Sequence, residues 1–422
     1  LKTLSLRSDA LNNESAILLS DLSSLITLSI SSNALTNLPD FSSIALLEEL
    51  TIRAPIESLN GITQNRNLKH LEIDSASATF PTAFSWPLLE SLYLSNVMLE
   101  SLSQVNGLET LKQLSLQSIG LTAIDELSAL KDLTKLDVSR NDITDISAVR
   151  DLSNLTQINI SNNPVENIEV LGELSYLTEL TAGSYGVEQD WAFVSSLSFL
   201  RELNLTEVDA DDLRALSNLS GSIKNLDLNE VNASDLSDLF EFYRLQNLSI
   251  YGAHEGKAFY CWQQDYLESL PKYNGYVYGH YGSNGCDTSD DVNDYDGDGV
   301  SNIDELYRQS NPTENDNEPA AIEFLESSLS YYEQPTGVMY SGVLRRKGNS
   351  LSSSSVTLTD FYDTADSYDY SFYSAYESFY PGDNAISFDF YIKEDDLKDE
   401  RHFQQYLSDQ NNRVFKEQLS GL

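Results

Sequence analysis

The sequence predicts an α/β solenoid of about 12 repeats, each mostly a strand plus a 3₁₀ segment or turn, followed by an all-β segment. Two observations carry this prediction. A Leu-x-x-Leu-x-Leu pattern, as in residues 111–116, recurs every 21 to 24 residues along the first 250 residues. Near the C-terminus, residues 354–359 and 387–392 alternate in the way that strands do. The repeats begin at Leu1, Leu25, Leu47, Leu68, Leu89, Leu111, Leu133, Leu155, Leu177, Leu200, Ile223 and Leu245.

A period of about 20–29 residues headed by this pattern is the signature of a leucine-rich-repeat solenoid. One unit cannot bury its apolar side alone, so a stack of repeats is needed to form the core. In the unit that starts at Leu133, strand alternation turns Leu136 and Val138 inward. Lys135 and Asp137 then face outward on the concave sheet. Apolar residues three apart follow, which predicts a 3₁₀-like wall.

The repeats resemble those of internalin-type bacterial proteins, whose unit of about 22 residues reads Asn-x-Ile-x-Asp-Ile-x-x-Leu-x-x-Leu-x-x-Leu. Asn141 and Ile143 match this pattern in place. The resemblance covers about residues 1–258 and implies a solenoid. The asparagine that closes the turn recurs only at Asn33, Asn141 and Asn163. We therefore expect its buried hydrogen-bond ladder to be patchy.

The chain is strongly acidic, with 66 Asp and Glu against 25 Lys and Arg in 422 residues and a formal net charge of −41. Residues 259–318 are the most acidic part, with 13 acids against 2 bases. Such a field repels nucleic acid and anionic membrane surfaces, so neither is expected as a partner. It suits divalent cations, basic partners or simply solubility. No apolar run approaches the ~20 residues of a membrane helix, so no membrane insertion is expected.

Two cysteines, Cys261 and Cys286, follow the last repeat. A solenoid needs its terminal repeat covered, and many extracellular leucine-rich-repeat proteins do this with a small disulfide-closed cap. On that pattern, residues 259–286 form a cap in which the two cysteines are bonded, which implies an oxidising compartment. Two free thiols are the alternative, and a zinc site would need more nearby ligands. Because the chain opens inside a repeat at Leu1, its native start is expected upstream.

Residues 287–318, which contain few large apolar residues, are predicted to form a calcium-binding connector. Their acids fall at positions 1, 3 and 5 of a 12-residue loop, with Gly299 at the sharp turn. The pattern resembles a bacterial thrombospondin type 3 repeat, which implies a stiff connector on a secreted protein; a solvated acidic loop is the alternative. The predicted ligands are Asp294, Asp296, Asp298, Val300 through its carbonyl, Asn302 and Glu305. Candidates for a second ion are Asp287, Asp290, Asp291 and Asp316.

The segment 319–422 resembles a Calx-beta domain, the β-sandwich of sodium–calcium exchangers and many bacterial surface proteins. Motifs that carry the resemblance are Val343-Leu-Arg345-Arg-Lys-Gly348 and Phe379-Tyr-Pro381-Gly382-Asp383. No closing strand with an acidic end is recognisable after Leu407. Calcium-binding members hold ions through acidic residues, and by position the resemblance implies the ligands Glu333, Asp369, Asp395, Asp396 and Glu400.

Nothing in the sequence indicates an enzyme, because the four histidines are scattered and no nucleophile, phosphate-loop or zinc-protease motif occurs. The outward strand residues are mostly small or polar, unlike the clustered Trp, Tyr and Arg of protein hot spots. We therefore expect the concave face to bind a polar ligand, either a protein or a glycan, and the chain to be monomeric. The candidate binding residues are Arg53, His70, Tyr93, Lys135, Asp137, Arg140, Glu179, Glu202, Asp227 and Tyr251.

Together these patterns predict an extracellular or cell-surface recognition and adhesion protein of bacterial type, with calcium as its cofactor and a calcium-stiffened connector. The alternative from another class is a non-catalytic ancillary region of a secreted hydrolase. A third possibility is a structural spacer without a specific ligand.

Overall fold

The computed structural model contains two compact units, Leu1–Asn232 and Ala233–Leu422. The residues that it describes are 1–75, 78–105, 107–240, 242, 245–252, 258–269, 274–278, 286–308, 312–313, 317, 321–324, 338–347, 353–361, 370–372, 376–380, 385–392, 402–409 and 414–420. Among them, no helix combines the length and the apolar character needed to cross a membrane.

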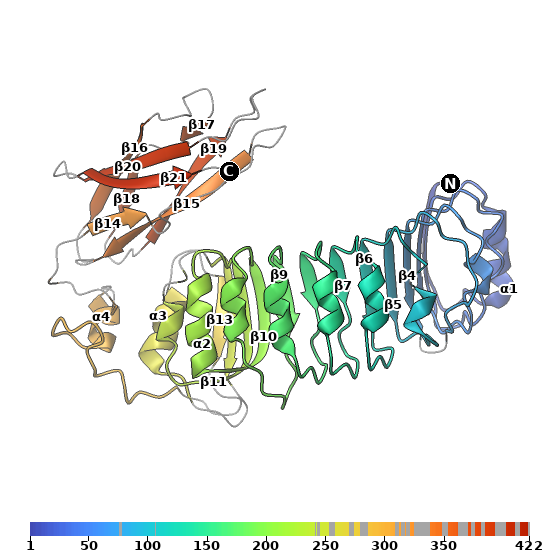
Figure 1. Ribbon diagram of the computed structural model, residues 1–422, viewed down its shortest axis with the longest axis horizontal. Coiled ribbons are helices and arrows are strands. Elements are labelled where there is room, and N and C mark those ends of the chain that lie inside the picture. Colours follow the sequence, from blue (N-terminus) through green and yellow to red (C-terminus); the bar gives the residue numbers. More distant parts are fainter. Residues whose placement is uncertain are drawn as a thin grey trace. The chain divides into compact units, whose positions relative to one another are not determined.

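Unit 1 is a stack of parallel strands in which each strand pairs with the next along the chain (Figure 1). The register advances by one repeat per strand, so that Leu114, Leu136 and Ile158 are aligned. This arrangement confirms the predicted solenoid. The strands are β1 (Thr3–Arg7), β2 (Thr27–Ser31), β3 (Glu49–Arg53), β4 (His70–Asp74), β5 (Ser91–Ser95), β6 (Gln113–Gln117), β7 (Lys135–Asp137), β8 (Gln157–Asn159), β9 (Glu179–Ala182), β10 (Glu202–Asp209) and β11 (Asn225–Asn232).

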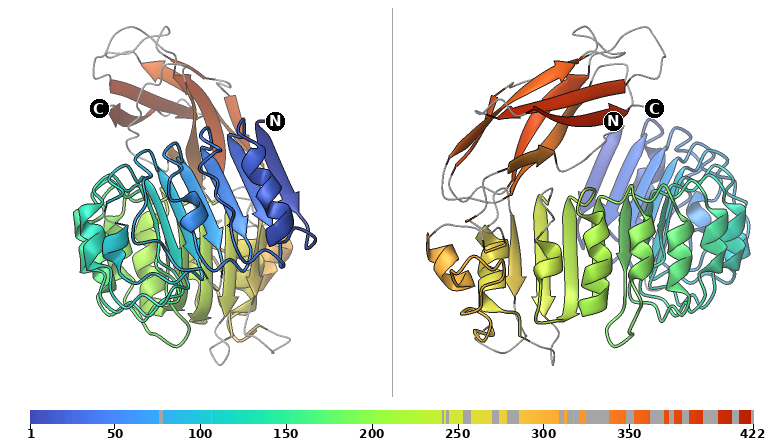
Figure 2. Two further views of the ribbon diagram at one scale, coloured as in Figure 1. Left: turned by 90° about the vertical axis from the view of Figure 1, so that its right-hand side faces the viewer. Right: turned by 60° about the vertical axis from the view of Figure 1, so that its left-hand side comes forward.

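Short helical segments, mostly 3₁₀, return the chain between strands, as the three-residue apolar spacing predicts. Figure 2 shows the strands on one side of unit 1 and the helical segments on the other. The core lies between them: Leu133, Val138, Ile143, Ile146 and Val149 are all fully buried. The segments are α1 (Asn13–Ala16), η1 (Ile17–Asp21), η2 (Asn60–Ile62), η3 (Leu102–Gln104), η4 (Asp125–Ala129), η5 (Ser147–Asp151), η6 (Ile168–Glu173), η7 (Ala192–Ser196), α2 (Ala210–Leu216) and η8 (Ser217–Leu219).

In six repeats the chain turns inward through a residue in the left-handed region, which residues other than Gly seldom adopt. Each of these residues is the eighth of its repeat, and the ninth then points toward the core. Asn141 is such a ninth residue, and its Nδ2 donates to the carbonyls of Leu116 and Val138, both at 2.8 Å. The six residues, with φ between 53° and 63°, are Asn96, Ser118, Arg140, Asn162, Glu207 and Glu230.

The prediction that Asn33 belongs to the buried hydrogen-bond ladder is wrong. Asn33 is exposed, and the preceding Ser32 is buried in its place. The Ser32 hydroxyl donates to the carbonyl of Leu11 at 2.7 Å. Because no left-handed residue precedes the turn in this repeat, the eighth residue rather than the ninth faces inward.

Unit 2 begins with elements that continue the repeat pattern. β12 (Asn247–Gly252) pairs in parallel with β13 (Asn274–Tyr278), a strand that lies inside the predicted cap and that the sequence did not predict. The bond between Cys261 and Cys286 is confirmed, with Cα atoms 4.9 Å apart. The helical segments are η9 (Ser237–Leu239), α3 (Cys261–Ser269) and α4 (Asn302–Arg308).

The rest of unit 2 contains two antiparallel four-stranded sheets, ordered β14-β15-β19-β17 and β18-β16-β20-β21. The predicted strands at 354–359 and 387–392 are confirmed as parts of β16 and β19. A further strand follows Leu407, contrary to the sequence expectation, and it pairs with β20. The strands are β14 (Ala321–Phe324), β15 (Val338–Lys347), β16 (Ser354–Phe361), β17 (Tyr370–Phe372), β18 (Tyr376–Phe379), β19 (Ala385–Ile392), β20 (His402–Asp409) and β21 (Val414–Ser420).

Candidate functional site

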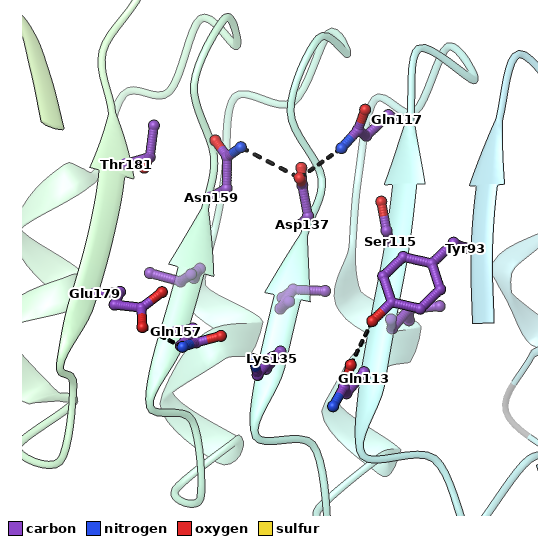
Figure 3. A pocket seen from close by; sticks show the side chains of 13 residues that line it. Tyr93, Gln113, Ser115, Gln117, Lys135, Asp137, Gln157, Asn159, Glu179 and Thr181 are labelled. Carbon is purple, nitrogen blue, oxygen red and sulfur yellow. Dashed lines mark hydrogen bonds between the residues drawn. The ribbon is translucent and has the colours of Figure 1, made fainter. Parts of the chain in front are cut away.

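The outward face of strands β5 to β9 contains a shallow depression of about 230 Å³ (Figure 3). Four of the predicted binding residues line it: Tyr93, Lys135, Asp137 and Glu179. Six further polar residues line the depression but were not among the predicted binding residues, although they occupy the third, fifth and seventh positions of the same repeats. These are Gln113, Ser115, Gln117, Gln157, Asn159 and Thr181.

The remaining predicted residues do not line this depression. Arg140 is wrong as a sheet-face residue, because it lies beyond the end of β7 in a left-handed turn with φ 58°. The others lie on strands away from the depression: Arg53 on β3, His70 on β4, Glu202 on β10, Asp227 on β11 and, in unit 2, Tyr251 on β12.

Asp137 is the centre of a hydrogen-bond network in the depression. Gln117 Nε2 donates to its Oδ2 at 2.6 Å, and Asn159 Nδ2 donates to the same atom at 3.2 Å. The backbone N–H of Ser139 donates to Oδ1 at 2.9 Å. A carboxylate offers about four lone-pair sites, so Asp137 is fixed in orientation and retains acceptor capacity.

A second row of side chains crosses the depression two residues before Asp137 and its equivalents in the neighbouring strands. Gln113, Lys135, Gln157 and Glu179 follow one another in register from β6 to β9. The Tyr93 hydroxyl donates to Gln113 Oε1, and Gln157 Nε2 donates to Glu179 Oε1. These contacts orient both glutamine amides. Among the described residues, no ion pair joins the exposed Lys135.

Tyr93 closes the β5 end of the depression. Its ring lies 5.2 Å from that of His70, at an interplanar angle of 47°. Burial raises the pKa of the Tyr93 phenol, and the nearby Glu72 carboxylate raises it further. Glu72 is itself paired with the Arg53 guanidinium at 2.8 Å. Tyr93 is therefore a neutral aromatic wall at physiological pH, and its neighbours help to hold it in place.

A similar network occurs on β10 and β11, the two strands that follow the depression. Asn204 Nδ2 donates to Asp227 Oδ2 at 3.2 Å, and Asn229 Nδ2 donates to Asp227 Oδ1 at 3.1 Å. Burial raises the pKa of Asp227, and the hydrogen bond from Asn229 opposes this shift. Asp227 and Asp137 thus occupy the same strand position and have the same kinds of partner.

In the connector, the side chains of Asp294, Asp296 and Asp298 converge, with one oxygen of each within 4.8 Å of the others. Backbone N–H groups of Gly297 and Gly299 donate to Asp294 at 2.7 and 2.8 Å and help to lower its pKa. Both glycines have positive φ, 76° and 96°, which other residues rarely adopt. Burial raises the pKa of Asp296 to about 7, and the neighbouring Asp298 and Asp294 carboxylates add to this shift.

The other predicted ligands close and flank this loop. Asn302 is fully buried; its Oδ1 accepts from the Tyr295 N–H at 2.8 Å, and its Nδ2 donates to the Asp290 carbonyl at 3.2 Å. Glu305, also fully buried, lies in the first turn of α4. Val300 donates its N–H to Asp298 Oδ1 at 2.8 Å. Clustered carboxylate oxygens are the hard donors that calcium prefers, so this set fits that ion.

The connector is attached to the cap within unit 2. The Cys261 N–H donates to the Asp287 carbonyl at 2.9 Å, and the Asp287 N–H donates to the Phe259 carbonyl at 2.7 Å. The Tyr295 ring lies 5.6 Å from that of Trp262 and 6.1 Å from that of Phe240. The half-exposed Tyr295 ring of the loop therefore packs beside buried aromatic side chains of unit 2. The proposed sandwich ligands Glu333, Asp369, Asp395, Asp396 and Glu400 lie outside the described residues.

Comparisons with known proteins concern the repeats. A family model for two copies of leucine-rich repeats matches residues 131–173, which include β7 and β8. An internalin structure from Listeria monocytogenes is 20% identical with a TM-score of 0.43, and the match covers 55% of this chain and 75% of that one. The functional domain of InlJ from the same organism, described as including a cysteine ladder, is 17% identical with a TM-score of 0.46. That match covers 100% of this chain and 81% of the other. No curated protein matches.

The family model, the repeat period and the parallel strand stack agree, so unit 1 has the leucine-rich-repeat fold.

Proposed function

We propose that this chain is an extracellular recognition protein that binds a polar ligand, protein or glycan, on the face of unit 1 formed by β5 to β9. The observation that carries the proposal is the fixed polar network of the depression, centred on Asp137. Side chains already ordered by one another lose little conformational freedom on binding. The proposed role is non-covalent recognition, without catalysis.

The extracellular assignment is supported by the Cys261–Cys286 bond, because disulfides persist mainly in oxidising compartments. The cell-surface role and the internalin-like character remain parts of this proposal. The connector would then bind calcium through Asp294, Asp296 and Asp298, with Glu305 at the start of α4. Bound calcium would neutralise three carboxylates that repel one another.

The test is a binding screen of the full chain against arrayed glycans and extracellular proteins. The wild type should show saturable binding, and a variant with Asp137→Ala and Asn159→Ala should lose it. A matched control carries Asp125→Ala and Glu126→Ala, two exposed residues on the segment η4. Equal binding by both variants, or no saturable ligand for the wild type, would contradict the proposal.

A further inference from the structure

The polar groups of the depression repeat at the spacing of the strands. Ser115, Asp137 and Asn159 are aligned in register on β6, β7 and β8. The row that contains Lys135 and Gln157 is aligned in the same way. Neighbouring strands lie about 4.8 Å apart, so a ligand that runs across the strands meets an equivalent polar group about every 4.8 Å.

The groups in these rows are suited to hydroxyl ligands. The Asp137 carboxylate accepts hydrogen bonds, while the amides of Gln113, Gln117 and Asn159 offer both donors and acceptors. Gln117 and Asn159 hold Asp137, and Tyr93 holds Gln113, so the acceptors and donors are aimed before a ligand arrives (Figure 3). Such an array matches a ligand that has polar groups along its whole length.

An extended peptide fits the same rows less well. It turns equivalent groups to one side at every second residue, about 6.6–6.8 Å apart, which is out of step with the strand spacing. Protein hot spots also rely on clustered aromatic and Arg anchors, whereas Tyr93 is the single aromatic residue and no Arg occurs among the lining residues. A linear sugar chain instead carries hydroxyls on every unit and around its whole length, so that it can offer a hydrogen-bond partner at each strand.

We propose that the depression binds a linear oligosaccharide laid across β5 to β9, with its hydroxyls hydrogen-bonded to Asp137 and the neighbouring amides. One sugar ring lies against the Tyr93 ring at the β5 end, and Lys135 faces the middle of the oligosaccharide. This inference rests on the proposed recognition role of the same face and specifies its ligand class.

The test uses the full chain and an array of linear glycans, neutral and uronic-acid-containing, followed by calorimetric titration of each hit as a series from one to eight sugar units. The affinity should rise with length and level off once the ligand spans five strands. Asp137→Asn should weaken binding by about tenfold or more, because a charge-assisted acceptor is lost.

Asp227→Asn is the matched control. Asp227 holds the same strand position and accepts from two asparagines, but it lies on β11, outside the depression. This variant should bind like the wild type. Thermal unfolding of both variants shows whether they retain the fold.

Three outcomes overturn the inference: equal loss of affinity in both variants, an affinity that does not depend on ligand length, or no saturable binding across the glycan array. If proteins then bind in an Asp137-dependent way, the recognition role of the face stands and only the ligand class falls. If no ligand of either kind depends on Asp137, the proposed function falls as well.

Discussion

The indole N–H of Trp262 donates to an Asp290 carboxylate oxygen at 2.9 Å. Trp262 lies in the cap helix α3, whereas Asp290 belongs to the acidic connector. The backbone N–H of Trp262 also donates to Asp291, at 3.1 Å. Two acids that the sequence offered as ligands for a second ion therefore accept hydrogen bonds from the cap. A connector with few large apolar residues of its own gains a core in this way, because Trp262 is fully buried.

Asp290→Ala should destabilise the cap by about 1–3 kcal/mol, because the buried Trp262 indole N–H loses its acceptor. The measurement is chemical denaturation followed by tryptophan fluorescence. Asp304→Ala removes the same charge from an exposed position on α4 and serves as the control. If both variants lose equal stability, general charge rather than this hydrogen bond explains the effect.

Calorimetry with calcium should detect a site in the Asp294–Glu305 loop, with an affinity on the order of micromolar to millimolar, as in extracellular modules. Asp296→Asn should remove one bound ion, because Asp296 is one of the three converging carboxylates of the cluster. Asp304→Asn should leave the number of ions unchanged. An unaltered stoichiometry in Asp296→Asn would falsify the assignment of the loop.

Asn141→Ala should cost on the order of 3 kcal/mol, because buried backbone groups lose their partners. Its Oδ1 accepts from the N–H groups of Ile119 and Leu121, both at 3.1 Å, in addition to the two carbonyls that its Nδ2 contacts. Asn33→Ala, at the same repeat position in the sequence, should change stability by less than about 0.5 kcal/mol because Asn33 is exposed. Urea denaturation measures both. Similar losses would show that the two asparagines have the same role.

This pair of asparagines shows what the repeat pattern can and cannot predict. The strands follow from apolar spacing, because buried positions such as Leu136 and Val138 must face one core. The turn depends on a single φ angle, and the left-handed residues there include Ser118 and Glu207, which carry no such signal. The strand β13 was missed because its partner β12 stabilises it from outside the local sequence.

The sequence predicted which side chains face outward on the sheet, but not where along the sheet the depression lies. Strand alternation correctly turned Tyr93, Asp137 and Glu179 outward. The small Ser115 between larger neighbours and the hydrogen bonds to Asp137 depend on which side chains become neighbours across strands. The sequence alone does not give those pairings at side-chain resolution.

Asp212 gives unit 1 a pH dependence of its own. It is the third residue of α2, it is 6% exposed, and its two oxygens accept from the N–H groups of Trp191 and Asp209, both at 2.9 Å. Burial raises its pKa to about 6, the two hydrogen bonds oppose this shift, and the Asp209 and Asp190 carboxylates add to it. The folded state thus holds the Asp212 proton more tightly than the unfolded chain does.

Because its pKa is raised in the fold, the Asp212 carboxyl contributes its full stabilisation when the pH is below its pKa in the unfolded chain. This contribution is lost as the pH rises through about 6. About 1 kcal/mol should be lost between pH 5 and 7.5, a range that stays above the pI of about 4.1. Asp212→Asn cannot ionise, and its amide cannot accept both N–H groups, so it should be less stable than the wild type throughout. The stability difference between the two proteins should narrow by about 1 kcal/mol as the pH rises over this range, measured by denaturation followed by tryptophan fluorescence. A difference that is constant with pH would show that Asp212 is already ionised in the fold at pH 5.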